Sequence, residues 1–245
     1  MTAPGLIAQT WVVLRKDLQI EFQRPARVTG IFFFALGLLL LVAAATPPSG
    51  VLRALAPGTL WIGLFLASTR SLDQSYTVET ETGALEGLAL WPADARALFY
   101  GKALANTAVL VAVAMALLPL LVAVFDAPVR GITLANLFGW PPGGEGGPYL
   151  AGVLAFAVLG SAAIAAPGTL YGLIAAEARG SSVLLPLLLF PLVFPALLCA
   201  AKGTTVLFEG DPMGDASAWF QMLAAFTALH WSLSGVLYRR ILEDG

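Results

Sequence analysis

Long apolar runs separated by short polar segments extend along most of this chain. A helix that crosses a bilayer needs roughly 20 mostly apolar residues, and six runs in the sequence come close to that length. The pattern therefore predicts six transmembrane helices, at about residues 28–46, 54–70, 103–125, 150–176, 183–201 and 217–238. Pro57 lies near the start of the second run, but neighbouring helices can satisfy the backbone group that a proline frees within a membrane.

Apolar residues also recur with helical spacing before the first of these runs. Over residues 6–24 they follow the period of one helix face, at Ile7, Trp11, Leu14, Leu18 and Phe22. The next proline is expected to end this helix, because proline lacks the amide hydrogen that a helix interior uses. A basic amphipathic helix directly before a span is expected to lie in the cytoplasmic interface of the membrane. The alternative is a flanking segment that only directs insertion.

The composition is typical of a chain that lies in lipid. Of its 245 residues, 58% are hydrophobic and 11% are charged, whereas a soluble domain carries about 25% charged residues. We therefore predict an all-α polytopic membrane protein with a single transmembrane domain over residues 1–245. The first 27 residues lack the apolar stretch and cleavage site of a signal peptide, so the first span is expected to direct its own insertion.

Lysine and arginine residues are distributed unevenly between the two sides of the predicted bundle. Cytoplasmic segments of membrane proteins carry an excess of these residues. With the N-terminus placed in the cytoplasm, the inside segments carry Arg15, Lys16, Arg24, Arg27, Arg70, Arg96, Lys102, Arg179, Arg239 and Arg240. The outside segments carry only Arg53, Arg130 and Lys202. Both termini are therefore expected to be cytoplasmic.

A polar coupling segment, residues 71–102, separates the second and third spans. Four acids fall close together within it: Asp73, Glu79, Glu81 and Glu86. The charge distribution assigns this segment to the cytoplasm, and it is too short to form a domain. We interpret it as a cytoplasmic coupling helix that docks a soluble partner. Asp94, near its end, is expected to cap the third helix, which begins before the membrane.

The sequence lacks the usual motifs of nucleotide binding and metal catalysis. It contains no GxxxxGK[ST] loop, no HExxH motif and no cysteine cluster. The single Cys199 cannot form an internal disulfide, and we interpret it as a small apolar residue of its helix. The acids of the coupling segment lie where exposure is expected and have no histidine beside them. We predict a non-catalytic subunit and expect no nucleic-acid partner.

The only histidine of the sequence, His230, lies in the sixth span. An ionisable residue within a membrane is a functional candidate by default, and imidazole is a common axial ligand of haem iron. No second histidine is present to complete a bis-histidine site. The alternative is a neutral histidine that forms a hydrogen bond with a neighbouring helix.

Two spans carry unusual residue types. The fifth span contains Pro186, Pro191 and Pro195, which predict a kinked or broken helix. Such a helix is either a moving gate, a re-entrant segment or a static bend. The fourth span is rich in glycine, alanine and serine, which let helices approach closely in lipid. We expect that span either at a subunit or gate interface, or in tight packing within one subunit.

An amphipathic helix, six spans and an acidic segment after the second span together resemble the ABC-2 type permeases of ABC exporters. In that class the acidic segment reads roughly E-x-x-x-G-[TS]-L-E-x-L, followed by a proline. This chain matches it with Glu79, Gly83, Leu85, Glu86, Leu88 and Pro92, and has Ala84 at the hydroxyl position. Two stretches more narrowly resemble the CcmB family of cytochrome c maturation permeases: LAPGTLWIGLFLASTRSLDQSYTVETETGALEGLALWP, Leu55–Pro92, and SSVLLPLLLFPLVFPALLCA, Ser181–Ala200.

The resemblance implies the membrane subunit of an ABC transporter complex in the bacterial inner membrane. A separate, CcmA-like ATPase subunit would use ATP and bind the docking residues Glu79, Glu81, Gly83, Leu85, Glu86, Leu88 and Pro92. The other implied partners are a second permease copy, a haem-handling membrane protein, a haem chaperone and the lipid bilayer. Haem is implied as cargo. ATP hydrolysis would drive either haem export or release of the haem-loaded chaperone.

Two other functions fit the same sequence. One is an ABC-2 permease that exports a lipid, a glycan or a drug. The other is an assembly scaffold that transports nothing and couples ATP use only to the remodelling of a complex. Neighbouring genes for haem-handling proteins would favour cytochrome c maturation over the first, and a haem flux by the reconstituted complex would argue against the second.

Overall fold

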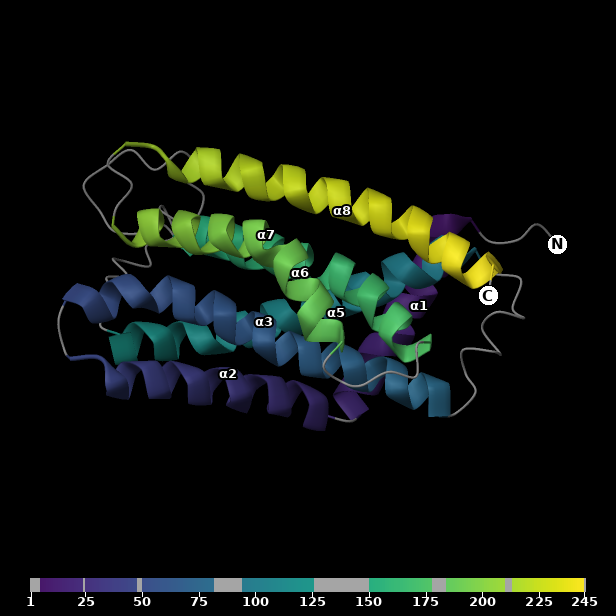
Figure 1. The fold of residues 1–245 in the computed structure, drawn as a ribbon, viewed down its shortest axis with the longest axis horizontal. Helices are drawn as coiled ribbons and strands as arrows, with labels where there is room; N and C mark the ends of the chain where they lie inside the picture. The colour runs from purple at the N-terminus through teal and green to yellow at the C-terminus, as the bar shows by residue number, and fades with distance from the viewer. Residues whose placement is uncertain are drawn as a thin grey trace.

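The computed structural model describes residues 5–23, 25–47, 50–81, 94–125, 150–177, 184–209 and 213–244. Within these ranges the chain forms seven α-helices and no strand. They are α1 Leu6–Gln23, α2 Ala26–Ala45, α3 Gly50–Glu81, α5 Ala95–Phe125, α6 Leu150–Glu177, α7 Leu184–Phe208 and α8 Ala216–Asp244. Figure 1 shows an elongated bundle in which most helices run along the long axis. The predicted all-α class is confirmed.

In the described part of the chain, six helices are long and apolar enough to cross a membrane. These candidate spans are Ala26–Ala45, Gly50–Thr69, Ala95–Phe125, Ala151–Ala175, Leu185–Phe208 and Ala216–Ile241. The number and order of the predicted spans are therefore confirmed. α1 is not among them, and Figure 1 shows it crossing the long axis at the end of the bundle where α8 terminates.

α7 extends beyond the predicted end of its span at residue 201. The hydroxyls of Thr204 and Thr205 donate to the carbonyls of Ala200 and Ala201 at 2.7 and 2.8 Å, so these polar side chains are satisfied within the helix. Lys202, which the sequence assigned to a loop, is an exposed residue of the same helix. The connection to α8 is correspondingly shorter than predicted.

α6 is the most buried of the spans and contacts α3, α5, α7 and α8. Its glycines explain how it fits there. A Cβ atom on Gly160 would lie 2.2 Å from the ring of Trp61 in α3, and one on Gly168 would lie 2.5 Å from the side chain of Leu72. Of the two interpretations for this small-residue span, its contacts support tight packing within one subunit.

α7 is one uninterrupted helix although Pro191 and Pro195 lie inside it. Pro186 lies in its first turn, where amide groups have no partner within the helix anyway. Figure 1 shows that the helix bends along its course. The prolines therefore bend α7 without breaking it, and a gating role for them stays a prediction.

Candidate functional site

The predicted docking residues fall between α3 and α5. Glu79 and Glu81 belong to the last turn of α3, which continues well beyond the predicted span end at residue 70. The other docking residues, Gly83, Leu85, Glu86, Leu88 and Pro92, lie outside the described residues. The coupling segment thus begins as a continuation of a long helix, and its last part, from Ala95 on, belongs to α5.

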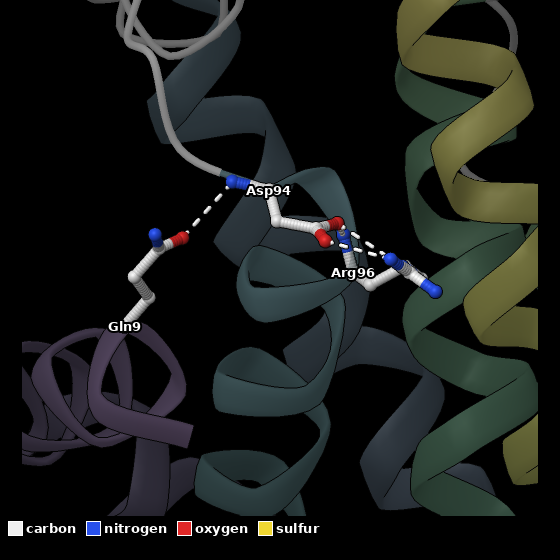
Figure 2. A network of polar contacts seen from close by, with 3 residues as sticks. All are labelled: Gln9, Asp94 and Arg96. Atoms are coloured by element: carbon white, nitrogen blue, oxygen red, sulfur yellow. Dashed lines mark hydrogen bonds and ion pairs between the residues drawn. The ribbon is translucent and has the colours of Figure 1, made fainter. Parts of the chain in front are cut away.

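Asp94 ends the connection from α3 and caps α5 (Figure 2). Its Oδ1 accepts a hydrogen bond from the amide of Arg96 at 2.9 Å. The Arg96 guanidinium also donates a hydrogen bond to each carboxylate oxygen, with Nε 3.2 Å from Oδ1 and Nη2 2.9 Å from Oδ2. These hydrogen bonds hold the pKa of Asp94 below its ordinary value. The predicted capping role of Asp94 is confirmed.

Gln9 of α1 joins this cap from a distant part of the chain. Its side-chain Oε1 accepts a hydrogen bond from the backbone amide of Asp94 at 2.9 Å, as Figure 2 shows. Farther along, α1 packs directly against α5 at Gly101, because glycine has no side chain to hold the two helices apart. A Cβ atom at Gly101 would lie 2.6 Å from the side chain of Val13 and 3.0 Å from the carbonyl oxygen of Thr10.

The end of α1 is attached by a polar network that reaches into the bundle. The carboxylate of Glu21 pairs with Arg27 at the start of α2, with Oε1 2.7 Å from Nη1. Arg27 Nη2 donates to Oδ1 of Asn106 in α5 at 2.8 Å, and Asn106 Nδ2 donates to Oγ1 of Thr169 in α6 at 3.0 Å. We call Glu21, Arg27, Asn106 and Thr169 the Glu21 network. It joins four helices.

Burial dominates the electrostatics of the Glu21 network. Desolvation raises the pKa of Glu21 above its ordinary value, and the neighbouring Asp17 adds to this effect. The positive charges of Arg27 and Lys102 act in the opposite direction. Lys102 is itself only 7% exposed. The network therefore holds charged groups away from water at the edge of the apolar bundle.

This network was not predicted from the amino-acid sequence. Arg27 and Lys102 were counted only as positive flanks of their spans, and Asn106 and Thr169 were not singled out. One signal was available. Asn106 is the single amide within the apolar run 103–125, and a polar side chain inside a span usually finds a partner on another helix.

The two ends of the apolar stripe of α1 are exposed, whereas Leu14 and Leu18 in its middle are half-buried. Ile7, Trp11 and Phe22 are 85%, 65% and 86% exposed, and α1 has no fully buried residue. Toward the bundle, Gln9 contacts the amide of Asp94, Val13 lies against Gly101, and Glu21 pairs with Arg27. The exposed apolar side chains on the other side suit a helix whose outer face lies in a membrane interface.

His230 is buried within the bundle. Its ring stacks on Phe226 with the centroids 3.9 Å apart, and Nδ1 lies 2.9 Å from the carbonyl oxygen of Phe226. This contact is made within α8 and not with a neighbouring helix, because residues four apart share one helix face. Among the described residues, no group of three or more His, Cys, Asp or Glu side chains could hold a metal ion. A haem contact by His230 stays a prediction.

Comparison with known proteins gives consistent matches along the chain. The profile of the family described as CcmB protein matches residues 8–237. Heme exporter protein B of Pseudomonas aeruginosa is 25% identical over 224 residues, which cover 91% of each chain. Heme exporter protein B of Paracoccus denitrificans is 31% identical over 220 residues, covering 88% of this chain and 89% of the relative. The protein of the same name from Bradyrhizobium diazoefficiens is 29% identical over 216 residues, covering 88% of each.

Proposed function

The chain belongs to the CcmB protein family, and on that premise we propose that it is the membrane subunit of a haem exporter used in c-type cytochrome maturation. The observation that carries the proposal is the likeness to proteins named Heme exporter protein B over about nine tenths of the chain. Six helices able to cross a membrane support a transporter subunit.

We further propose that a separate ATPase subunit drives this exporter. The 245 residues contain no GxxxxGK[ST] loop, so a partner would supply the nucleotide site. The docking residues begin in the last turn of the long helix α3, with Glu79 and Glu81, and end in the sequence two positions before Asp94, the cap of α5. A partner bound there would act on two spans at once. Closure of two ATPase subunits would then move two permease copies as rigid bodies.

The complex would also include the haem-handling membrane protein and the haem chaperone of the maturation system. ATP hydrolysis then drives either haem export or release of the haem-loaded chaperone. Haem flux into sealed vesicles that contain the complex distinguishes the two, because only export moves haem across the bilayer. His230 is proposed only as a contact of passing haem, through Nε2, because Nδ1 already faces the carbonyl oxygen of Phe226.

The test of this proposal is charge reversal at the docking residues. The double variant Glu79→Lys, Glu86→Lys is expected to insert normally but to lose the co-purifying ATPase and the assembly of c-type cytochromes, because like charges then face the partner's groove. Affinity purification in mild detergent, with quantification of the ATPase, measures this.

The matched control reverses two acids assigned to the opposite side of the membrane, Glu145→Lys and Glu209→Lys, and is expected to retain the ATPase. Glu209 is exposed just after the end of α7. Undiminished recovery of the ATPase with the Glu79, Glu86 double variant would refute docking at this segment.

A further inference from the structure

The charged residues of α1 are divided between its two sides. Both of its acids turn toward the bundle, and the side chains of Asp17 and Glu21 are only 13% and 12% exposed. Its two basic residues, Arg15 and Lys16, are exposed. The lysine extends from the outer side to Asp17, with Nζ 3.0 Å from Oδ1. The outer side of α1 therefore carries positive charge and no exposed acid.

Arg15 points away from the bundle. Val13 marks the side of α1 that faces the bundle, because it lies against Gly101 of α5. Arg15 follows Val13 by two positions, which is roughly 200° around an α-helix. Within the part of the chain that the structure describes, Arg15 forms no hydrogen bond or ion pair. Any fixed partner of its guanidinium must therefore come from outside this part of the chain.

Exposed aromatic side chains flank Arg15 on the outer side of α1. Trp11 lies one turn before it and Phe22 lies two turns after it, so the three residues share one helix face. Both aromatic side chains are largely exposed. A tryptophan ring is favoured at the level of the lipid headgroups. At that depth a guanidinium meets lipid phosphates, and its planar shape lets it donate two parallel hydrogen bonds to phosphate oxygens.

We propose that the outer side of α1 binds anionic phospholipids, with Arg15 on the lipid phosphate and with Trp11 and Phe22 against the acyl chains. The ligand is a lipid with a net negative charge, such as phosphatidylglycerol. A zwitterionic lipid offers the same phosphate, but its cationic headgroup is repelled by Arg15 and Lys16. The proposal concerns this surface alone and depends neither on an ATPase nor on haem.

The experiment measures which lipid lies next to Trp11 in the full-length protein, reconstituted in vesicles of equal parts phosphatidylglycerol and phosphatidylcholine. Bromine atoms on acyl chains quench tryptophan fluorescence at short range. They are placed on phosphatidylglycerol in one sample and on phosphatidylcholine in the other. Subtraction of the signal of Trp11→Phe isolates Trp11 from the other tryptophans. Phosphatidylglycerol is expected to be enriched about fivefold beside Trp11, the effect of one basic residue near an anionic membrane surface.

Three variants test the role of Arg15. Arg15→Gln is expected to reduce the enrichment to nearly one without changing the melting temperature, because this side chain points away from the bundle. Arg15→Lys keeps the charge and is expected to retain most of the enrichment. Arg240→Gln is the matched control, since it removes another exposed arginine, in α8, and is expected to leave the enrichment beside Trp11 unchanged.

The other possible results all contradict the proposal. Equal quenching by the two brominated lipids in the wild type overturns it, as does an enrichment that Arg15→Gln leaves intact. Weak quenching by both lipids would show that protein covers the outer side of α1. Inorganic phosphate, added at constant ionic strength, is expected to leave the enrichment unchanged. Loss of the enrichment in phosphate would indicate a site for a soluble anion instead of a lipid.

Discussion

Two acidic side chains at the contact between α1 and α5 experience opposite environments. Hydrogen bonds from Arg96 lower the pKa of Asp94, so this carboxylate contributes stability above its ordinary pKa and loses it as the pH falls through the lowered value. Burial raises the pKa of Glu21. Its contribution is therefore largest at low pH and is lost as the pH rises through the raised value. At neutral pH the shifted pKa of Asp94 therefore favours the folded state, whereas the shifted pKa of Glu21 partly opposes it.

Asp94→Asn is expected to lower the thermal stability at pH 7. Asparagine still caps a helix, but the pair with Arg96 is lost, which costs roughly 0.2–1 kcal/mol for a partly exposed ion pair. The difference from the wild type should shrink as the pH falls from the ordinary pKa of 3.8 through the lowered pKa of folded Asp94. Unfolding of the detergent-solubilised protein at pH 7 and pH 3 measures it. An equally large gap at both values would contradict the assignment, and Arg96→Gln should reproduce the loss.

Gly160→Ala is expected to destabilise the bundle by about 1–3 kcal/mol, the usual effect of overpacking. The new methyl group would lie 2.2 Å from the ring of Trp61, which is 2% exposed and is also held by a hydrogen bond from Nε1 to Thr204. Gly37→Ala in α2 is the matched control, since no atom lies within 4 Å of its added Cβ. Equal melting temperatures for the two variants would show that Trp61 can move aside.

At the scale of helices, the sequence predicted what local periodicity determines. Spans are recognised from continuous apolar runs, and α1 from its spacing of apolar residues, so their number and order were correct. The length of α7 was underestimated because Thr204 and Thr205 are polar and suggest a loop in the sequence. In the structure their hydroxyls donate to carbonyls of the preceding turn, so both residues remain helical. The Glu21 network was missed because its members meet only in the folded chain.

The two faces of α1 are expected to differ in their access to lipid. Spin labels at Phe22→Cys and Ile7→Cys should collide readily with oxygen dissolved in the bilayer, because both side chains point away from the bundle. A label at Val13→Cys should be protected by α5, since Val13 lies against Gly101. Power-saturation electron paramagnetic resonance in liposomes measures this, with buried Cys199 replaced by alanine. Equal oxygen access at all three sites would contradict an interfacial position of α1.

At the scale of the whole molecule, one end of the bundle gathers α1, the cap of α5 and the end of α8 (Figure 1). Arg239 of α8 lies near enough to help lower the pKa of Asp94. The opposite end carries the connection from α7 to α8, with Gly214 in the left-handed conformation at φ 75°. The hydrogen bond from Asp94 to Gln9 and the one from Arg27 to Asn106, which link elements distant in sequence, therefore lie toward the end that α1 crosses.

We expect this end to face the cytoplasm, because cytoplasmic segments carry most of the lysine and arginine residues. A fluorescent protein fused after Gly245 should fluoresce, and alkaline phosphatase fused there should be inactive. The same phosphatase inserted after Glu145, on the predicted outer side, should be active. The reverse pattern would invert the orientation and remove the docking residues from the reach of any cytoplasmic ATPase.

The attachment of α1 has a consequence for the order of assembly during translation. Gln9 leaves the ribosome 85 residues before the Asp94 amide that it contacts, and Arg27 leaves it 79 residues before Asn106. α1 is therefore synthesised well before its binding surface on α5 exists. Until then, the apolar side chains of α1 that are exposed in the folded protein, such as Ile7, Trp11 and Phe22, can bind the bilayer surface while its polar side stays hydrated. The first helix to be made is thus among the last to reach its final position.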